Sequence, residues 1–424
     1  MMNRRTFSTL LAGSVTAPAL SSGMSSASWG QTARTRMALY SGVGPELTHY
    51  EVDVDGATLT KRAAVKLPGG VQYAWPHASR QFLYVTSSTG GPGMTGNSHH
   101  VSAFRIDASG ALQPHGEPLA LKHRPIHNSV DRSGEYLLIA YNSPSSATVH
   151  RLKSDGLIGE AVPQPDGLDC GIYGHQILAT PSNQSVLLVT RGNNAADGKP
   201  EDPGSLKVFG FKDGVLSNKA SVQPGTGLGF GPRHLDFHPT RPLVYVSIER
   251  QNQLYVYELT PDGGLSRDPL FVKSTLIGPD KQVTSAGPIH VHPSGRFVYL
   301  TNRAPSSTPA PGEELFEGKR VVTSNDSTIA VFAIDPDTGE PRLVETGDAH
   351  GAHVRTFSFD ASGHTLVAGS LIPVALRQGD KVTVMPAGLS VFRVGQDGKL
   401  TFTRKYDIDT GTLTQWWSGM IALA

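Results

Sequence analysis

Arginines, histidines and one glutamate recur at matching positions of a hairpin-like sequence pattern. The clearest are Arg233 and His234 in GPRHLDFHP, Glu249 at the end of VYVSIE, and Arg303 at the end of FVYLTNR. Guanidinium groups bind carboxylates and phosphates through paired hydrogen bonds, and imidazoles and carboxylates transfer protons near neutral pH. These residue types therefore predict a site that binds a small anionic molecule and moves a proton.

Counting from the predicted turns places these side chains at one end of their hairpins. Arg233 and Glu249 each lie eight residues from Arg241, and His175 and Arg191 each lie eight residues from Asn183. Residues equidistant from a turn are neighbours in an antiparallel hairpin. The same count, applied along the chain, gives a shared rim of His127, His175, Arg191, Arg233, His234, Glu249, Arg303 and Arg355. Of these, we interpret His175, Glu249, Arg233 and Arg303 as catalytic, and His127, Arg191, His234 and Arg355 as substrate-binding.

Structural roles are the alternative for some of these residues. Polar side chains near a shared axis also hold neighbouring units together, so His234 can be a buried structural histidine. His290 and His292 have the H-x-H spacing of metal ligands, but His292 takes the turn-entry position of His238 in the preceding unit, which favours packing. No compact cluster of Asp, Glu and Asn is found in the sequence, and we predict no metal and no cofactor.

The elements that position these residues form a repeat. The clearest copies are GPRHLDFHPTRPLVYVSIERQNQLYVYEL at 231–259 and GPIHVHPSGRFVYLTNR at 287–303. Looser copies begin at Ala74, Arg124, Gly174 and Val354. Each copy has two short apolar strands around a polar turn, then a loop and a third strand. A spacing of roughly 50–60 residues is typical of radial repeats whose units bury their faces against each other.

The chain ends complete the last unit. Six hairpins are internal, whereas residues 36–56 supply strands that lack an innermost partner and TLTQWWSGMIALA at 412–424 supplies one strand alone. Pairing the two ends closes the ring and removes exposed strand edges. We therefore predict an all-β, seven-bladed β-propeller over residues 36–424. Two inserts, Asn193–Pro203 and Ala304–Asn325, are rich in Pro, Gly, Ser and charge and are predicted to be loops.

The first 27 residues have the features of a twin-arginine signal peptide. Arg4 and Arg5 precede Phe7 and a short, Ser/Ala-rich apolar run, which is too short for a membrane span. We expect a periplasmic or secreted protein that uses the twin-arginine export machinery. Cys170 is the single cysteine, which excludes an intramolecular disulfide, and we interpret it as a buried, unreactive thiol. The net charge of +1 argues against a nucleic-acid-binding surface, and we expect a monomer.

The chain resembles the seven-bladed lactonase family, which includes propeller-type 6-phosphogluconolactonases and 3-carboxy-cis,cis-muconate lactonising enzymes. The matching segments are GPRHLDFHP, VYVSIE, IHVHPSGRFVYLTNR and STIAVFAIDPDTGEP. The resemblance implies an active site of one histidine, two arginines and one glutamate, which fall on His175, Arg233, Arg303 and Glu249. Two departures, Arg191 in place of an acidic residue and Val354-Arg355-Thr356 in place of a PRH-like triplet, indicate an altered substrate pocket.

From the rim and the resemblance we expect an exported lactonase that hydrolyses the ring ester of a small anionic lactone. Either His175 or Glu249 would activate water, and the other would protonate the leaving oxygen. One alternative is the reverse chemistry, cycloisomerisation of a muconate. A second alternative is a non-catalytic propeller that binds a ligand or a partner, because the fold alone does not imply activity.

Overall fold

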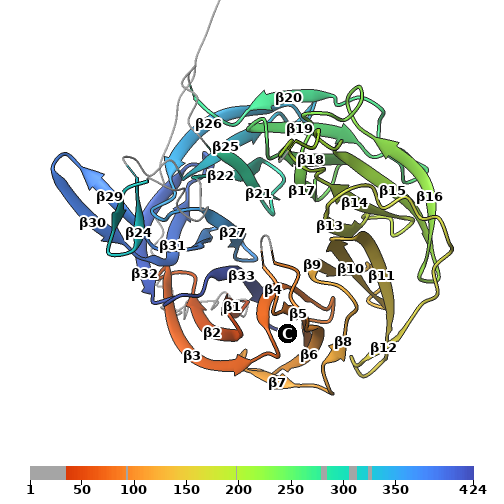
Figure 1. Cartoon of the computed structure of the whole chain (residues 1–424), viewed down its shortest axis with the longest axis horizontal. Helices are drawn as coiled ribbons and strands as arrows, with labels where there is room; N and C mark the ends of the chain where they lie inside the picture. Colours follow the sequence, from red (N-terminus) through yellow and green to blue (C-terminus); the bar gives the residue numbers. More distant parts are fainter. Residues whose placement is uncertain (1–34, 92–93, 197, 278–283, 305–312, 323–326) are drawn as a thin grey trace, which may run out of the picture. The chain divides into compact units, whose positions relative to one another are not determined.

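Seven antiparallel sheets are arranged around a common axis in residues 35–424 (Figure 1). The computed structural model describes residues 35–91, 94–196, 198–277, 284–304, 313–322 and 327–424, so the predicted signal peptide lies outside the described residues. The described part is built of strands and turns, and it holds no helix long and apolar enough to cross a membrane. The predicted all-β propeller is confirmed.

Each blade is a meander whose first strand lies nearest the axis. Blade 1 contains β4 (Gly70–Pro76), β5 (Phe82–Ser88), β6 (His99–Ile106), β7 (Leu112–Pro114) and β8 (Leu119–Ala120). Blade 2 contains β9 (Pro125–Val130), β10 (Tyr136–Asn142), β11 (Ser145–Leu152) and β12 (Ile158–Ala161). Blade 3 contains β13 (Gly174–Ala179), β14 (Ser185–Thr190), β15 (Ser205–Lys212) and β16 (Val215–Val222). Blade 4 contains β17 (Pro232–Phe237), β18 (Leu243–Ile248), β19 (Gln253–Glu258) and β20 (Phe271–Ser274).

The remaining blades follow the same order around the ring. Blade 5 contains β21 (Ser285–Val291), β22 (Phe297–Arg303), β25 (Thr328–Ile334) and β26 (Pro341–Asp348). Blade 6 contains β27 (Val354–Phe359), β28 (Thr365–Ser370), β31 (Ala387–Val394) and β32 (Leu400–Ile408). Blade 7 contains β33 (Gln415–Ala422), β1 (Met37–Val43), β2 (Glu46–Asp53) and β3 (Thr58–Lys66). Because β33 pairs with β1, strands from both chain ends close the ring, as the unmatched terminal strands predict.

The core is divided among the interfaces between blades. Seven clusters of buried apolar side chains are found in the described part, one between each pair of neighbouring blades. The tyrosine of the repeated V-Y-V pattern completes several of these interfaces. The hydroxyl of Tyr245, for example, donates to the carbonyl of Gly339 in the next blade at 3.0 Å, and Tyr84 donates to Gly156 at 2.9 Å. Burial therefore joins each blade to its neighbours.

Histidines at the turn entries also bridge neighbouring blades. Nε2 of His238 donates to the carbonyl of Gly295 at 2.9 Å, and Nε2 of His292 donates to Gly363 at 2.9 Å. Both glycines have positive φ, and a Cβ at Gly363 would lie 2.2 Å from the His292 ring. His292 therefore packs between blades, and His290 lies beside Asp236, with 3.4 Å between Nδ1 and Oδ2.

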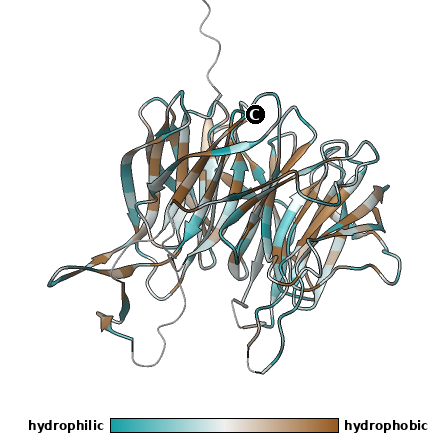
Figure 2. Ribbon diagram, turned by 90° about the horizontal axis from the view of Figure 1, so that it is seen from above, coloured by the Kyte–Doolittle hydropathy of each residue, from teal (hydrophilic) through white to brown (hydrophobic). Residues whose placement is uncertain are grey.

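The prediction for Ala304–Asn325 as a loop is wrong. This insert contains β23 (Leu315–Phe316) and β24 (Lys319–Val322), and β24 pairs in parallel with β29 (Val374–Gln378) of a hairpin completed by β30 (Lys381–Met385). The extra sheet combines inserts from blades 5 and 6 and extends outward at the left of Figures 1 and 2. The sequence of neither insert alone predicts this sheet, because each insert supplies only two short strands. The described part of the other insert, Asn193–Pro203, contains no β-strand.

Candidate active site

The innermost strands share an irregularity that aims side chains toward the axis. In six of the seven blades, one residue of the innermost strand is an extra residue between two successive pairs of the ladder, which is a β-bulge. The extra residues are Gln72, Ile126, His175, Arg233, Arg355 and Trp416. In blade 5 the register shifts around Gly287, where a Cβ would lie 2.9 Å from Cδ of Arg303. Gly287 therefore leaves room for the Arg303 side chain.

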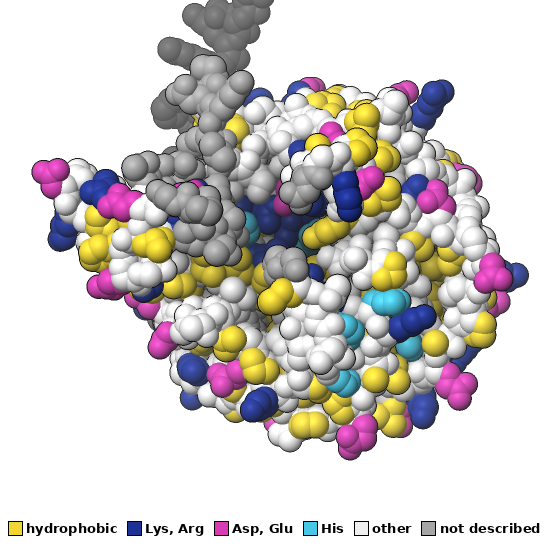
Figure 3. Space-filling model, in the orientation of Figure 1, with side chains coloured by type: hydrophobic (Ala, Val, Ile, Leu, Met, Phe, Trp, Pro, Cys, Tyr) yellow, Lys and Arg dark blue, Asp and Glu magenta, His cyan; other side chains and the backbone are white. Residues whose placement is uncertain are grey.

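These bulges and the neighbouring strand ends enclose a small, polar cavity. Its volume is about 130 Å³, and Figure 3 shows the dark blue of basic side chains in the hollow at the centre of the ring. The lining residues are Arg124, Ile126, Tyr173, His175, Arg191, Arg233, Glu249, Arg303, Arg355 and Trp416. Blades 2 to 7 all contribute to this set. The structure thus brings together six of the eight predicted rim residues.

His127 and His234 do not line the cavity. They lie beneath it, where the His234 ring is 5.0 Å from the His175 ring and 6.0 Å from the His127 ring. His127 is fully buried, and Nη1 of Arg233 donates to Nδ1 of His234 at 3.5 Å. Neither ring borders the cavity, and His234 reaches the cavity through its contacts with Arg233 and His175, a position that favours the structural alternative for His234.

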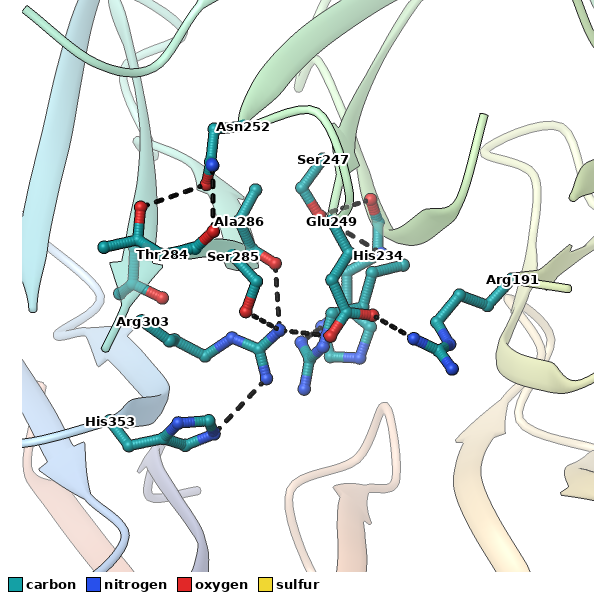
Figure 4. Close-up of polar contacts among 12 residues, drawn as sticks. Arg191, His234, Ser247, Glu249, Asn252, Thr284, Ser285, Ala286, Arg303 and His353 are labelled. Atoms are coloured by element: carbon teal, nitrogen blue, oxygen red, sulfur yellow. Dashed lines mark hydrogen bonds and ion pairs between the residues drawn. The ribbon is translucent and has the colours of Figure 1, made fainter. Parts of the chain in front are cut away.

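Glu249 is the one carboxylate that lines the cavity in the described part of the chain. Its Oε1 accepts a hydrogen bond from Nη2 of Arg303 at 2.5 Å, and its Oε2 lies 3.6 Å from Nη1 of Arg191 (Figure 4). Burial alone raises the pKa of Glu249, but the charges of Arg303, Arg233 and Arg191 outweigh burial and hold its pKa at about 2. Glu249 is therefore ionised throughout the neutral range.

Arg303 is fixed by contacts on several sides. Its Nη2 donates to Oγ of Ser285 at 3.2 Å and to the carbonyl of Ala286 at 3.1 Å. Its Nη1 donates to Nε2 of His353 at 3.4 Å (Figure 4). Nδ1 of His353 in turn donates to the carbonyl of Ala304 at 2.6 Å. An arginine held in this way presents its charge to the cavity without reorganisation, which favours stabilisation of a developing anion.

His175 faces these arginines as a neutral imidazole. Burial and the charges of Arg233, Arg355, Arg191 and Arg303 keep its pKa well below 6.5. Its ring lies 6.5 Å from the Tyr173 ring in a stacked arrangement. A neutral imidazole can accept a proton, and any anion that offset the nearby positive charges would raise its pKa.

The cavity carries an excess of positive charge. Among the described residues, no carboxylate lies within ion-pair distance of Arg233 or Arg355. Burial and the charges of Arg303 and Arg124 lower the pKa of Arg355 to about 9, so it is still protonated at neutral pH. Five arginines against one glutamate favour an anionic ligand. Among the described residues, no group of three or more His, Cys, Asp or Glu side chains is arranged to hold a metal ion.

The hairpin count missed Arg124, Tyr173 and Trp416. Arg124 precedes the first strand of its blade, and its Nε donates to Oε1 of Gln72 at 3.0 Å. Trp416 lies in the terminal strand, which has no hairpin turn from which to count, and the Arg355 guanidinium lies over its ring at 3.7 Å. Alignment of the innermost strands would have found Trp416 at the position of Arg233. No sequence signal marks Tyr173.

Larger hollows lie away from these groups. Two of about 700 and 620 Å³ lie at the perimeter, between outer strands of blades 4 and 5 and of blades 6 and 7. Neither contains an arginine cluster or a histidine. The fold and the central cavity together define a seven-bladed β-propeller with an arginine-rich cavity on its axis.

Comparisons with known proteins specify the class further. Residues 34–413 match the family described as lactonase, 7-bladed beta-propeller, so the chain belongs to the seven-bladed β-propeller lactonase family. It is 30% identical to the 6-phosphogluconolactonase of Pectobacterium carotovorum over 75% of this chain and 87% of that protein. It is 26% identical to the 6-phosphogluconolactonase of Bacillus subtilis over 81% of this chain and 90% of that protein.

A solved structure with the same fold is the periplasmic gluconolactonase of Pseudomonas aeruginosa. It superposes with a TM-score of 0.65 at 19% identity, over 92% of this chain and all of that one. At this identity the likeness shows the shared fold.

Proposed function

We propose that the protein is an exported lactonase that hydrolyses the ring ester of a small anionic lactone. Lactone hydrolysis is the activity after which its family and its named relatives are called, and the chain is a 6-phosphogluconolactonase-like carboxylic-ester hydrolase. The observation that carries the anionic substrate is the cavity itself, where five arginines and one glutamate surround a neutral histidine.

The arginines bind the substrate and stabilise the transition state in this proposal. Arg233 and Arg355 lack a carboxylate partner among the described residues, so they are available to the carboxylate or phosphate of the substrate. Arg303, held by Glu249, Ser285 and Ala286, offsets the negative charge that develops on the carbonyl oxygen. This role belongs to the oxyanion-hole type and requires no metal.

His175 is the general base of the proposed reaction. It takes a proton from water as the water oxygen attacks the ester carbonyl carbon, and the resulting imidazolium gives that proton to the ring oxygen as the C–O bond breaks. Glu249 is less suited to take the proton, because its carboxylate is shared between Arg303 and Arg191 and its pKa is about 2. Glu249 instead holds the two arginines and reduces their mutual repulsion.

A lactone-hydrolysis screen tests this function. Purified protein is assayed against aldonolactones, phosphorylated aldonolactones and carboxylated γ-lactones, each with and without a chelator. We expect turnover of at least one anionic lactone, little turnover of its uncharged analogue, and no loss of rate with chelator. Incubation with a carboxylated muconate in the same screen tests the cycloisomerase alternative. Binding without turnover of any member would support the ligand-binding alternative instead.

A further inference from the structure

A second, larger pocket adjoins the central cavity. Its volume is about 580 Å³, and it shares two lining residues with the cavity, Arg124 and Tyr173. The remaining lining residues come from the loop after β5 (Gly91, Met94, Thr95 and Gly96), from the start of β6 (His99) and from the edges of blade 2 (Lys122, His123, Asn142, Ser143 and Pro144). Arg124 and Tyr173 thus lie between the pocket and the cavity and form a partition between them.

The volumes of the cavity and of the adjoining pocket limit how much of a substrate each can hold. Small-molecule sites usually have volumes of roughly 300–1,000 Å³. The central cavity, at about 130 Å³, has room for a single lactone ring with its charged group. The adjoining pocket, at about 580 Å³, falls within the usual range on its own. A substrate that used the whole region would therefore extend beyond the ring that reacts.

The adjoining pocket differs from the cavity in chemistry as well as in size. The cavity is lined by five arginines and Glu249. The described lining of the pocket has two charged side chains, Lys122 and Arg124, and its apolar surface comes from Met94, Pro144 and the ring of Tyr173. Met94 is 65% exposed, so its side chain is accessible to a ligand. Methionine and aromatic surfaces of this kind adapt to apolar or aromatic groups of varied shape.

Tyr173 occupies the partition in a strained backbone conformation. Its φ is 60°, in the left-handed region that a residue with a large side chain rarely adopts. A backbone hydrogen bond beyond the end of the hairpin helps to hold it there, because its carbonyl accepts the N–H of Arg191 at 2.9 Å. Its ring lies beside the guanidinium of Arg191, 4.7 Å from centroid to Cζ, and is stacked with His175. Strain at a residue between a reactive histidine and a pocket is typical of a functional position.

We propose that the adjoining pocket is a second substrate subsite, and that the substrate is an anionic lactone with an uncharged apolar or aromatic substituent on its ring. The lactone and its charged group occupy the arginine-lined cavity, while the substituent passes Arg124 and Tyr173 and rests against Met94 and Pro144. Arg124 is a specificity-determining residue in this arrangement, because its guanidinium borders both spaces and its buried Nη2 has no hydrogen-bond partner among the described residues. The proposal rests on the lactonase function proposed above.

Paired substrates and a blocking variant test the proposal. The substrates are γ-carboxy-γ-butyrolactone and its phenyl-substituted analogue, which share the ring and the charge. We expect kcat/KM to be at least about tenfold higher for the phenyl compound, the scale that a hydrophobic subsite gives. Thr95→Trp fills the pocket from an exposed position and should remove this preference. The matched control, Thr60→Trp on the exposed edge strand β3, should retain it.

Binding measurements separate failure of the subsite from failure of the lactonase function. Calorimetric titration with the two hydroxy acids that hydrolysis would form compares their affinities without any turnover. If neither lactone is hydrolysed but the phenyl hydroxy acid binds more tightly, and Thr95→Trp removes the difference, the subsite stands and the proposed reaction fails. Equal affinities and equal kcat/KM for the two series, or a preference that Thr95→Trp leaves intact, overturn the subsite. His123→Ala, which removes a ring from the same wall, replaces Thr95→Trp if that variant does not fold.

Discussion

Glu249 has an unusual position for a carboxylate, because it is buried among arginines and still ionised. Removing its charge should show whether Glu249 acts as an ion-pair partner of the arginines or as the catalytic base. Glu249→Gln keeps the size of the side chain but leaves Arg303 and Arg191 without a counter-charge. We expect kcat/KM to fall by roughly 10- to 100-fold, the scale of a lost charged hydrogen bond.

The matched control is Glu258→Gln, an exposed glutamate at the end of β19, which should leave kcat/KM unchanged. Steady-state kinetics with the best lactone of the screen measures both variants. A Glu249→Gln enzyme with near-normal turnover would show that the rim charges serve structure alone. A loss far above a hundredfold, with substrate affinity retained, would instead make Glu249 the base.

His175 is the residue whose loss should reduce the chemical step most. In His175→Asn the proton acceptor is missing, whereas the arginines that bind the substrate remain in place. We expect kcat to fall by about 10²- to 10⁴-fold with little change in KM, the usual effect of losing a positioned base. Single-turnover kinetics measures the chemical step, and His364→Asn, at an exposed turn, is the control. Retention of kcat within a few-fold would contradict the assignment of His175.

Among the secondary-structure elements, the turn-entry histidines connect blades without taking part in the site. Nδ1 of His292 accepts a hydrogen bond from the backbone of Ser294 at 3.2 Å, while Nε2 donates to Gly363. His292→Ala leaves the buried Gly363 carbonyl without its partner and should lower the free energy of unfolding by about 1–3 kcal/mol. Urea denaturation measures this change. The lactonase kcat/KM should not change, and a stability equal to that of the unaltered protein would contradict the bridging role.

Repetition made much of the fold predictable from sequence. Hairpins such as GPRHLDFHPTRPLVYVSIE show strand, turn and strand directly, and the unmatched strands at the two ends predict closure between β33 and β1. The extra sheet was not predictable in the same way, because it forms from two inserts that belong to different blades and are far apart in the sequence. When a short strand lacks alternating apolar and polar residues, its sequence does not indicate which strand it pairs with.

The sequence predicted which residues lie on the rim better than it predicted where their side chains point. Counting from the turn treats a hairpin as a regular ladder, but the bulge at Arg233 moves Glu249 opposite Gly231, whose carbonyl accepts the Glu249 N–H at 2.9 Å. The same count could not show that His127 and His234 lie under the cavity, because a side-chain direction reverses with each residue. Arg124 and Tyr173 enter the site from loops, where the repeat provides no register.

For the whole molecule, the proposed export depends on residues outside the propeller. In the predicted twin-arginine signal, Arg4 and Arg5 are the residues that the export receptor would read, so replacing both with lysine should keep the charge and block transport. We expect Arg4→Lys/Arg5→Lys protein to accumulate in the cytoplasm while its fold and its specific activity remain unchanged. Cell fractionation with an activity assay measures this. Recovery of the double variant from the periplasm at normal levels would refute the proposed export.

Buried histidines should make the stability of the whole molecule sensitive to pH. His127, His175, His234 and His353 are buried at or beneath the cavity, and burial together with nearby arginines lowers the pKa of each below 6.5, to about 3 for His127. Below pH 6.5 the unfolded chain binds protons at these residues and the folded protein does not. The free energy of unfolding therefore falls as pH decreases, by up to about 1.4 kcal/mol per pH unit for each histidine.

Glu249 acts in a different pH range. Its folded pKa of about 2 stabilises the protein above the ordinary glutamate pKa of 4.5, and this contribution is lost only as pH falls toward 2. Between pH 7 and pH 5 the histidines therefore dominate, and we expect the melting temperature to fall steadily across this interval. Calorimetry at matched ionic strength measures the change. An anionic ligand should reduce the decline, because it offsets the arginine charges that keep the nearest histidine, His175, neutral. A melting temperature that is constant from pH 7 to pH 5 would show that these histidines gain protons in the folded protein as readily as in the unfolded chain.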